Sequence, residues 1–186
     1  MISIRTLSLG ALLVAASAAV SSCLSPPEYP PIPEISFKDI STKRVVLPGG
    51  IGTYDSVQVT IKFQDGDGDL GLSNADTTSP FRYKNPDGSL NRYNNNYFFQ
   101  PQIRKSNGEY QDTVIDATSS YDSRFPRLPP DDRDGPKRGT LTFKQGFSGG
   151  TFSRNGRIVS VQFRVKIVDR ALHESNEITT EPITIK

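Results

Sequence analysis

Apolar and polar residues alternate along two stretches of the chain, and these stretches predict β-strands. In Ser56–Phe63 every odd-numbered position is apolar and every even-numbered position is polar. Residues 160–167 repeat the pattern, with Val161, Phe163 and Val165 on one face. Successive side chains of a strand point to opposite faces. Alternation of this kind is therefore typical of an antiparallel strand with one buried and one solvated face.

The remaining strand signals are weaker, and no helical period accompanies them. Beyond residue 34, no segment carries apolar residues at the 3.6-residue spacing of an amphipathic helix. About seven or eight strands joined by turn-rich segments predict an all-β fold, an antiparallel immunoglobulin-like β-sandwich. The weaker strand candidates are residues 35–40, 43–47, 97–105, 108–114, 139–145 and 177–186.

Two long connections separate the predicted strands. Segments 65–96 and 115–138 are rich in Asn, Asp, Gly, Pro and Ser, and most loops of compact domains are shorter. Such segments either carry function or are partly disordered, and the composition is compatible with both. The residues predicted to face the core are Ile35, Phe37, Val57, Val59, Ile61, Phe63, Leu141, Phe143, Val161, Phe163, Val165, Ile167, Ile183 and Ile185.

The residues before the strands have the three zones of a secretory signal peptide. Arg5 gives the start a positive charge, an uncharged apolar run extends from Leu7 to Val20, and two serines precede Cys23. The apolar run is shorter than the ~20 residues of a membrane-spanning helix, so a signal peptide over residues 1–22 is predicted. Cys23 is the only cysteine of the chain, which excludes an internal disulfide.

The Val-Ser-Ser-Cys ending of residues 20–23 resembles the bacterial lipobox, although that pattern prefers Leu first and Gly or Ala third. The resemblance implies that Cys23 is the lipid attachment site and the first residue of the mature protein. Several acyl chains, at about 0.8 kcal/mol per buried CH₂, would anchor it durably in a membrane. The proline-rich residues 23–34 then form an extended stalk before a domain over residues 35–186.

The charge balance excludes one class of partner. Removal of residues 1–22 takes away one of the 22 basic residues and none of the 20 acidic ones, so the mature chain is close to neutral. The sequence has no strong basic field and no polybasic run to hold nucleic acid. The expected partners are the membrane, through the lipid, and a ligand or another envelope protein.

Three aspartates follow the strand that ends near Phe63. Asp65, Asp67 and Asp69 are separated by single glycines, which permit positive φ and let the backbone curl so that the carboxylates converge. Converging negative charges repel unless a cation lies between them, and oxygen ligands favour calcium. An EF-hand would need glycine where Leu70 stands. The plain alternative is an acidic, glycine-rich turn without an ion.

The segment from Phe163 to Asn176 resembles the penultimate strand and following loop of bacterial immunoglobulin-like and cadherin-like domains. Asp169 closes the strand and Ser175-Asn176 matches the turn, whereas Leu172-His173 stands where these families have Gly-Asn. In a sandwich of that topology, the loop after the second strand and the loop before the last strand lie at the same end. The resemblance therefore implies a calcium site formed by Asp65, Asp67, Asp69, Asp169 and Asn176.

The whole layout resembles small outer-membrane lipoproteins of Bacteroidota. The resemblance rests on the lipobox, the proline stalk, residues 55–72 and residues 157–186. It implies a lipid-anchored protein of the cell envelope, at the outer membrane, on either its periplasmic or its surface side.

Groups that could perform catalysis are scarce in the sequence. His173 is the only histidine, no nucleophile-elbow sequence occurs, and with Cys23 lipidated no Cys/His set remains for zinc. We therefore expect a non-catalytic binding or structural module rather than an enzyme.

Two other roles stay open. Tyr93, Tyr97 and Phe98 lie beside the Asn-rich residues 94–96, and exposed aromatics there would suit a carbohydrate-binding or adhesion module. The simpler interpretation is that these aromatics are ordinary strand residues. The other role is that of an accessory subunit of an outer-membrane assembly, for which a broad, flat apolar face would be the signature.

Overall fold

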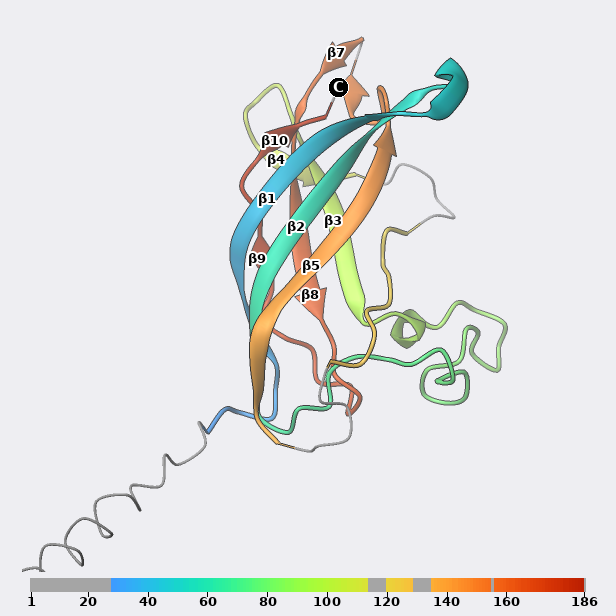
Figure 1. The fold of residues 1–186 in the computed structure, drawn as a ribbon, viewed down its shortest axis with the longest axis vertical. Helices are drawn as coiled ribbons and strands as arrows, with labels where there is room; N and C mark the ends of the chain where they lie inside the picture. Colours follow the sequence, from blue (N-terminus) through green and yellow to red (C-terminus); the bar gives the residue numbers. More distant parts are fainter. Residues whose placement is uncertain (1–27, 114–119, 129–134, 155, 186) are drawn as a thin grey trace, which may run out of the picture.

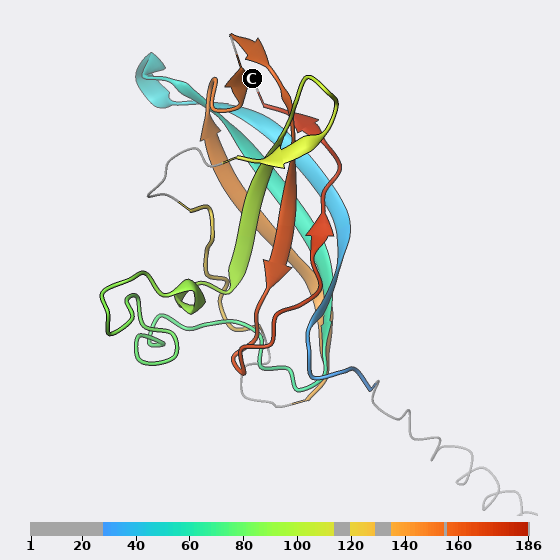
Figure 2. The same cartoon turned by 180° about the vertical axis from the view of Figure 1, so that it is seen from behind.

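The computed structural model describes residues 28–113, 120–128, 135–154 and 156–185. Within these ranges the chain forms an antiparallel β-sandwich, with two main sheets packed face to face (Figures 1 and 2). The all-β prediction is therefore confirmed. The predicted signal peptide and Cys23 lie outside the described residues, as do residues 114–119 and 129–134 of the second long connection.

The first sheet has the order β1-β2-β5 and consists of three long strands. They are β1 (Glu34–Val46), β2 (Thr53–Asp65) and β5 (Lys137–Ser148). The central strand β2 pairs along its whole length with both neighbours. The segments 35–40 and 43–47, predicted as separate strands, belong to one continuous strand in the structure.

The second sheet has the order β10-β8-β3-β4, and β9 also pairs with β8. Its strands are β3 (Tyr97–Arg104), β4 (Tyr110–Asp112), β8 (Ser160–Ile167), β9 (Ile178–Thr179) and β10 (Ile183–Thr184). Figure 2 shows this sheet in front of the first one. The C-terminal region forms two short strands in place of the single predicted one.

Three small elements complete the described part of the chain. The hairpin of β6 (Ser153–Arg154) and β7 (Arg157–Ile158) follows β5, and the alternation pattern did not predict it because each strand has only two residues. The 3-10 turn η1 (Pro48–Gly50) joins β1 to β2, and η2 (Arg92–Asn94) precedes β3. None of the helices in the described residues is long and apolar enough to cross a membrane.

The chain crosses repeatedly between the two sheets, and this crossing positions the candidate site. Strands β2 and β8 belong to different sheets, yet both run toward the same end of the sandwich, the lower end in Figure 1. The chain also enters the domain at that end, near residue 28 (Figure 1). The loops that follow β2 and β8 are therefore neighbours in space.

The core lies between the sheets and confirms most of the predicted inward-facing residues. The ring of Phe163 stacks on that of Phe99 with centroids 4.5 Å apart, and Tyr97 stacks on Phe143 at the same distance. Ten of the predicted residues are buried: Ile35, Val57, Val59, Ile61, Phe63, Val161, Phe163, Val165, Ile167 and Ile185.

The other predicted core residues are partly buried for reasons of position. Leu141 and Phe143 lie on β5, which is an edge strand of the first sheet. In β1 the register shifts between Phe37 and Asp39, and the position packed against the core passes to Ile40. A β-bulge inserts one residue, so it reverses the inward and outward faces of the strand beyond it.

Truncation of the central aromatic should be costly. We expect Phe163→Ala to lower the free energy of unfolding by about 3–5 kcal/mol, because it removes a fully buried ring from a close-packed stack. Urea unfolding followed by circular dichroism measures this. The half-buried Phe37 is the matched control: a loss from Phe37→Ala as large as that from Phe163→Ala would contradict this description of the core.

Candidate metal centre

Four carboxylates converge at the end of the sandwich where β2 and β8 finish. Asp65 is the last residue of β2, Asp67 and Asp69 lie in the loop that follows, and Asp169 follows β8. One oxygen from each of the four lies within 4.8 Å of the others. This set of four side chains is called the acidic cluster below. It joins the two sheets across the end of the core.

The glycines between the aspartates are required by close backbone packing. Gly68 has φ of +72°, and a Cβ there would lie 2.1 Å from the carbonyl oxygen of Gly135. A Cβ on Gly66 would lie 2.2 Å from the carbonyl oxygen of Tyr29. The chain on either side therefore holds the loop tightly, and only glycine fits at these positions.

Apolar anchors and backbone hydrogen bonds fix the rest of the loop. Leu70 and Leu72 are buried, and the Leu72 N–H donates to the carbonyl of Phe125 at 3.1 Å. At the start of the loop, the Gly66 N–H donates to the carbonyl of Pro30 at 2.8 Å. The carboxylates are thus directed inward by a backbone that is held at both ends.

The oxygens of the acidic cluster lack the hydrogen-bond partners that buried charges normally have. Asp65 has an exposed fraction of 0%, and neither of its carboxylate oxygens has a partner at normal hydrogen-bond geometry. The Gly68 N–H lies near enough to offset part of the rise in the pKa of Asp65. The Oδ1 atoms of Asp67 and Asp69 are also buried and unpartnered. Most buried polar side-chain atoms find a partner, so four such oxygens in one place form a position where a cation could bind.

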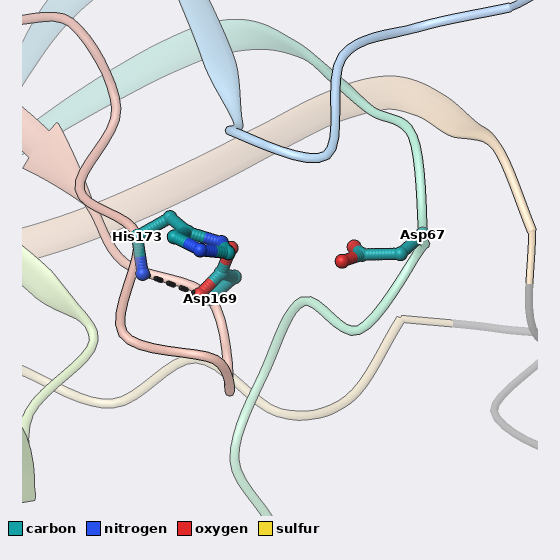
Figure 3. A group of neighbouring side chains, drawn as sticks. All are labelled: Asp67, Asp169 and His173. Atoms are coloured by element: carbon teal, nitrogen blue, oxygen red, sulfur yellow. Dashed lines mark hydrogen bonds and ion pairs between the residues drawn. The ribbon is translucent and has the colours of Figure 1, made fainter.

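The other oxygens of the cluster are held by the loop after β8. Asp169 is buried, with its Oδ1 accepting from the backbone N–H of His173 at 2.7 Å and its Oδ2 lying 2.8 Å from His173 Nδ1 (Figure 3). The Ala171 N–H donates to Asp69 Oδ2 at 3.0 Å. Figure 3 shows Asp67 pointing toward Asp169 from the opposite loop. The Ala171 bond leaves Asp69 Oδ1 buried without a partner, as Asp67 Oδ1 also is.

The loop after β8 takes a conformation that its sequence does not favour. Leu172 has φ of +69°, the left-handed region that usually requires glycine, and the families resembled in this segment have glycine there. Backbone bonds impose it: the Asp169 N–H donates to the carbonyl of His173 at 3.2 Å. A strained turn of this kind costs roughly 1 kcal/mol and is held by its surroundings.

Burial and mutual repulsion raise the pKa values of Asp65, Asp69 and Asp169. The pKa of Asp65 is raised to about 7, chiefly by burial and then by the charges of Asp67, Asp69 and Asp169. Burial is also the main cause of the raised pKa values of Asp69 and Asp169, and the N–H groups of His173 partly offset it at Asp169. Without a bound cation, the carboxyl of Asp65 is therefore mostly protonated below about pH 7.

The nearest basic side chains do not neutralise the cluster. Arg170 forms a two-pronged ion pair with Asp76, at 2.6 and 2.9 Å. Lys137, which pairs with Asp65 across the sheet, donates its ammonium to the carbonyl of Leu128 at 3.3 Å. Among the described residues, no charged side-chain nitrogen of Lys or Arg lies within 4.0 Å of the cluster's oxygens.

The cluster could hold a metal ion. Its ligand atoms are all carboxylate oxygens, which suit a hard cation. A second grouping, of Asp67, Asp169 and His173, adds one ring nitrogen. The ring already lies against Asp169, however, so the group made only of oxygens is the better-formed of the two.

The predicted ligand Asn176 has a different role in the structure. Its Oδ1 accepts from the Ile35 N–H at 2.8 Å, and its Nδ2 donates to the Ile35 carbonyl at 2.9 Å. Both ends of the amide are thus occupied by the backbone of β1, at the edge of the first sheet. The expectation that Asn176 joins the aspartates is corrected: it holds the last loop against β1.

The aromatic residues considered for sugar binding do not form an exposed platform. Tyr97 is 1% exposed and stacks in the core, and Phe98 is 8% exposed, with the guanidinium of Arg92 4.2 Å from its ring centroid. Tyr93 is partly buried. The expectation of a flat exposed aromatic face is therefore wrong at Tyr97 and Phe98, because both belong to a strand packed on each face.

The neighbouring asparagines are also engaged with the backbone. Asn94 donates to the carbonyl of Phe81 at 3.0 Å. Asn96 is buried, and its amide both donates to the Phe125 carbonyl and accepts from the Phe125 N–H. These amides hold loops together, so they are not free to bind a ligand.

Sequence reasoning missed the residues that organise the first long connection. Arg124 donates to the carbonyl oxygens of Ser73, Asp76, Phe81 and Asn94. The Arg170 guanidinium lowers the pKa of Asp76 well below its usual range. These partners are far apart in the chain, and nothing in the local pattern around Arg124 or Arg170 indicates them.

The fold and the site together define an antiparallel β-sandwich with a buried acidic cluster at one end. Comparisons with protein-family models, with curated proteins and with solved structures found no match to this chain. The acidic cluster and the sequence features described above are therefore the support for a proposed function.

Loss of the Asn176 amide should weaken the sandwich without touching the acidic cluster. We expect Asn176→Ala to lower the free energy of unfolding by about 1–3 kcal/mol, because it leaves both backbone groups of Ile35 without this partner. Urea unfolding measures the loss, which should be the same with and without added metal ions. A loss of stability seen only in the presence of metal ions would indicate that Asn176 is a metal ligand after all.

The metal-free protein should become less stable as the pH rises. Because the pKa of Asp65 is about 7 in the folded protein and 3.8 as a free side chain, the folded state binds its proton more tightly. The contribution of Asp65 to the free energy of unfolding is therefore largest at low pH and is lost between about pH 4 and pH 7.

Thermal unfolding in chelator across this pH range measures the slope. Asp65→Asn should raise the melting temperature at pH 8 and flatten the slope, because it removes the most buried carboxylate of the cluster. Asp39→Asn, at an exposed position of β1, should change neither. A slope that stays unchanged in Asp65→Asn would contradict the assignment.

Proposed function

We propose that the chain is a lipid-anchored, non-catalytic binding or structural module of the bacterial cell envelope, with a structural calcium ion in the acidic cluster. The observation that carries the proposal is the set of four buried carboxylate oxygens without partners, on Asp65, Asp67 and Asp69. A bound cation supplies the positive charge that the described side chains do not.

Calcium suits the acidic cluster better than zinc or magnesium. Calcium takes about six to eight oxygen ligands at about 2.3–2.6 Å in flexible geometry, and carboxylates bind it with one oxygen or with two. Zinc prefers Cys and His, and the one ring nitrogen grouped with these carboxylates in the described part of the chain, that of His173, already contacts Asp169. Magnesium keeps several waters and demands octahedral geometry, which four buried carboxylates from two loops supply poorly.

The ion would bind side chains from both sheets and so link them. Asp65 to Asp69 follow β2 of the first sheet, and Asp169 follows β8 of the second, so one cation contacts both. It would relieve the repulsion among the carboxylates and deprotonate Asp65. The loop it stiffens also carries the first long connection, residues 65–96, which extends sideways from this end (Figure 1).

The position of the site fits a tethered protein. The chain enters the domain beside the acidic cluster, and the Pro30 carbonyl accepts a hydrogen bond from Gly66 within the aspartate loop. A calcium ion there would also firm the junction between the stalk and the domain. Attachment at Cys23 is supported by the signal peptide and the lipobox resemblance, and an outer-membrane location by the wider resemblance.

The finer description of the fold as immunoglobulin-like belongs to the same proposal. Its support is the distribution of strands, since β1, β2 and β5 share one sheet while β3, β8 and the last short strands share the other. This is the A-B-E and C-F-G division of immunoglobulin-type sandwiches. Such domains present their loops at the two ends, which agrees with a binding or structural module.

Calcium should stabilise the soluble form, residues 24–186, against heat. At a calcium concentration 100-fold above the Kd, we expect about 2.7 kcal/mol of added stability, or a rise in Tm of roughly 5–10 °C. Differential scanning calorimetry in calcium and in chelator measures the shift, and isothermal titration calorimetry gives the stoichiometry.

The controls separate a site from general charge effects. A variant with Asp65, Asp67 and Asp69 changed to Asn should lose the calcium shift. A charge-matched variant of the exposed Asp39, Asp87 and Glu181 (Asp→Asn, Glu→Gln) should keep it. The absence of a shift in the unmodified chain, or an equal loss in both variants, would leave the cluster as an ordinary acidic turn.

A further inference from the structure

A basic hollow lies at the end of the sandwich opposite the acidic cluster. It has a volume of about 720 Å³ and lies between the turn that joins β3 to β4 and the β6–β7 hairpin. Figure 1 shows this hairpin at the upper end, whereas the chain enters the domain and β2 and β8 finish at the lower end. The hollow's charged lining consists of Arg104, Lys105, Arg154 and Arg157.

These four basic side chains have no acidic partner among the described residues. No described carboxylate oxygen lies within 4.0 Å of their charged nitrogens. Within the described ranges, the Arg104 side chain donates to the carbonyl of Gly108 at 3.3 Å. Glu109, the acidic residue of the same turn, accepts instead from the side chain of Asn107 at 2.7 Å. The hollow therefore concentrates positive charge on a chain that is close to neutral as a whole.

The hairpin places two of these charges directly opposite each other. Arg154 is the cross-strand partner of Arg157 in a strand pair of only two residues a side. Like charges in this arrangement destabilise a strand pair, and so short a hairpin has little pairing to offset the cost. An anion held between the two guanidinium groups would turn the repulsion into attraction.

We propose that this hollow binds a sugar-sized ligand that carries two or more phosphate or sulfate groups. Guanidinium groups match such oxyanions with paired hydrogen bonds, and a pair of them favours a ligand with more than one anionic group. The hydroxyls of Ser106 and Ser160 line the same hollow and add neutral hydrogen-bonding groups. The volume lies within the range of roughly 300–1,000 Å³ that is typical of small-ligand sites.

The position and rigidity of the hollow support this use. The Tyr110 and Ser160 hydroxyls lie 2.9 Å apart, which links β4 to β8 and fixes one wall. The hollow lies at the end of the sandwich opposite the point where the chain enters (Figure 1). A membrane tether at the entry point therefore leaves the hollow accessible. The inference uses no residue of the acidic cluster and stands whether or not that cluster binds calcium.

Isothermal titration calorimetry on residues 24–186 tests the proposal with defined probes. Inorganic pyrophosphate and a heparin-derived tetrasaccharide supply phosphate and sulfate groups, and a neutral tetrasaccharide is the uncharged control. We expect binding of at least one anionic probe, weaker at high salt, and none of the neutral one. The two anionic probes distinguish phosphate from sulfate as the preferred group.

The variant Arg154→Gln/Arg157→Gln should lower the affinity for the bound probe roughly 100-fold, since each lost charged hydrogen-bonding group costs about tenfold. Its Tm should stay unchanged or rise, because the repulsion across the hairpin is removed. Lys38→Gln/Lys144→Gln, at exposed positions of the first sheet, makes the same change in net charge and should keep the affinity within about twofold.

Three results would overturn the proposal. They are the absence of binding of both anionic probes at millimolar concentration, an equal loss of affinity in the two double variants, and tighter binding of a single-stranded oligonucleotide of matched charge. The second would show that only the overall charge acts. The third would show that the hollow is part of a nucleic-acid surface.

Discussion

The repulsion among four buried carboxylates is the constraint on which the lower end of this sandwich depends. Glycines that accept close backbone approach and leucines buried beyond them force the aspartates inward. The same packing removes the water and the side-chain partners that would normally stabilise those charges. A folded chain in this state must hold protons or a cation, and the partnerless oxygens of Asp65 show how little the protein itself supplies.

The surrounding loops hold the four carboxylates close together and do not neutralise their repulsion. Arg170, which follows Asp169 directly, pairs with Asp76 instead of the acidic cluster. Arg124 satisfies backbone carbonyls across the 65–96 connection, and Asn176 closes the last loop on β1. These charged and amide side chains hold the loops together, and the negative charge that they leave without a partner is that of the acidic cluster.

The two ends of the sandwich carry groups of opposite charge, and the roles proposed for them differ accordingly. The acidic cluster lies where the chain enters and where loops from both sheets meet, which suits an ion that stabilises the fold. The basic hollow at the far end has guanidinium groups without an acidic partner among the described residues, and one wall is fixed by the Tyr110–Ser160 contact, which suits an anionic ligand. An envelope protein with this division would be held firm near its anchor and would bind at its tip.

The sequence by itself determined the all-β class, most strand positions, most of the core and the glycine-spaced aspartate loop, because alternation and glycine spacing act on the local backbone. It divided β1 into two strands and merged β9 with β10. It also placed Asp169 correctly, through a resemblance to known strand and loop patterns. Only the tertiary structure decided that Asn176 binds Ile35, that Tyr97 and Phe98 are buried, and that arginines of two hairpins share a hollow. Those outcomes depend on contacts between residues far apart in the chain. The local sequence around a side chain does not determine which of these distant residues it contacts in the folded sandwich.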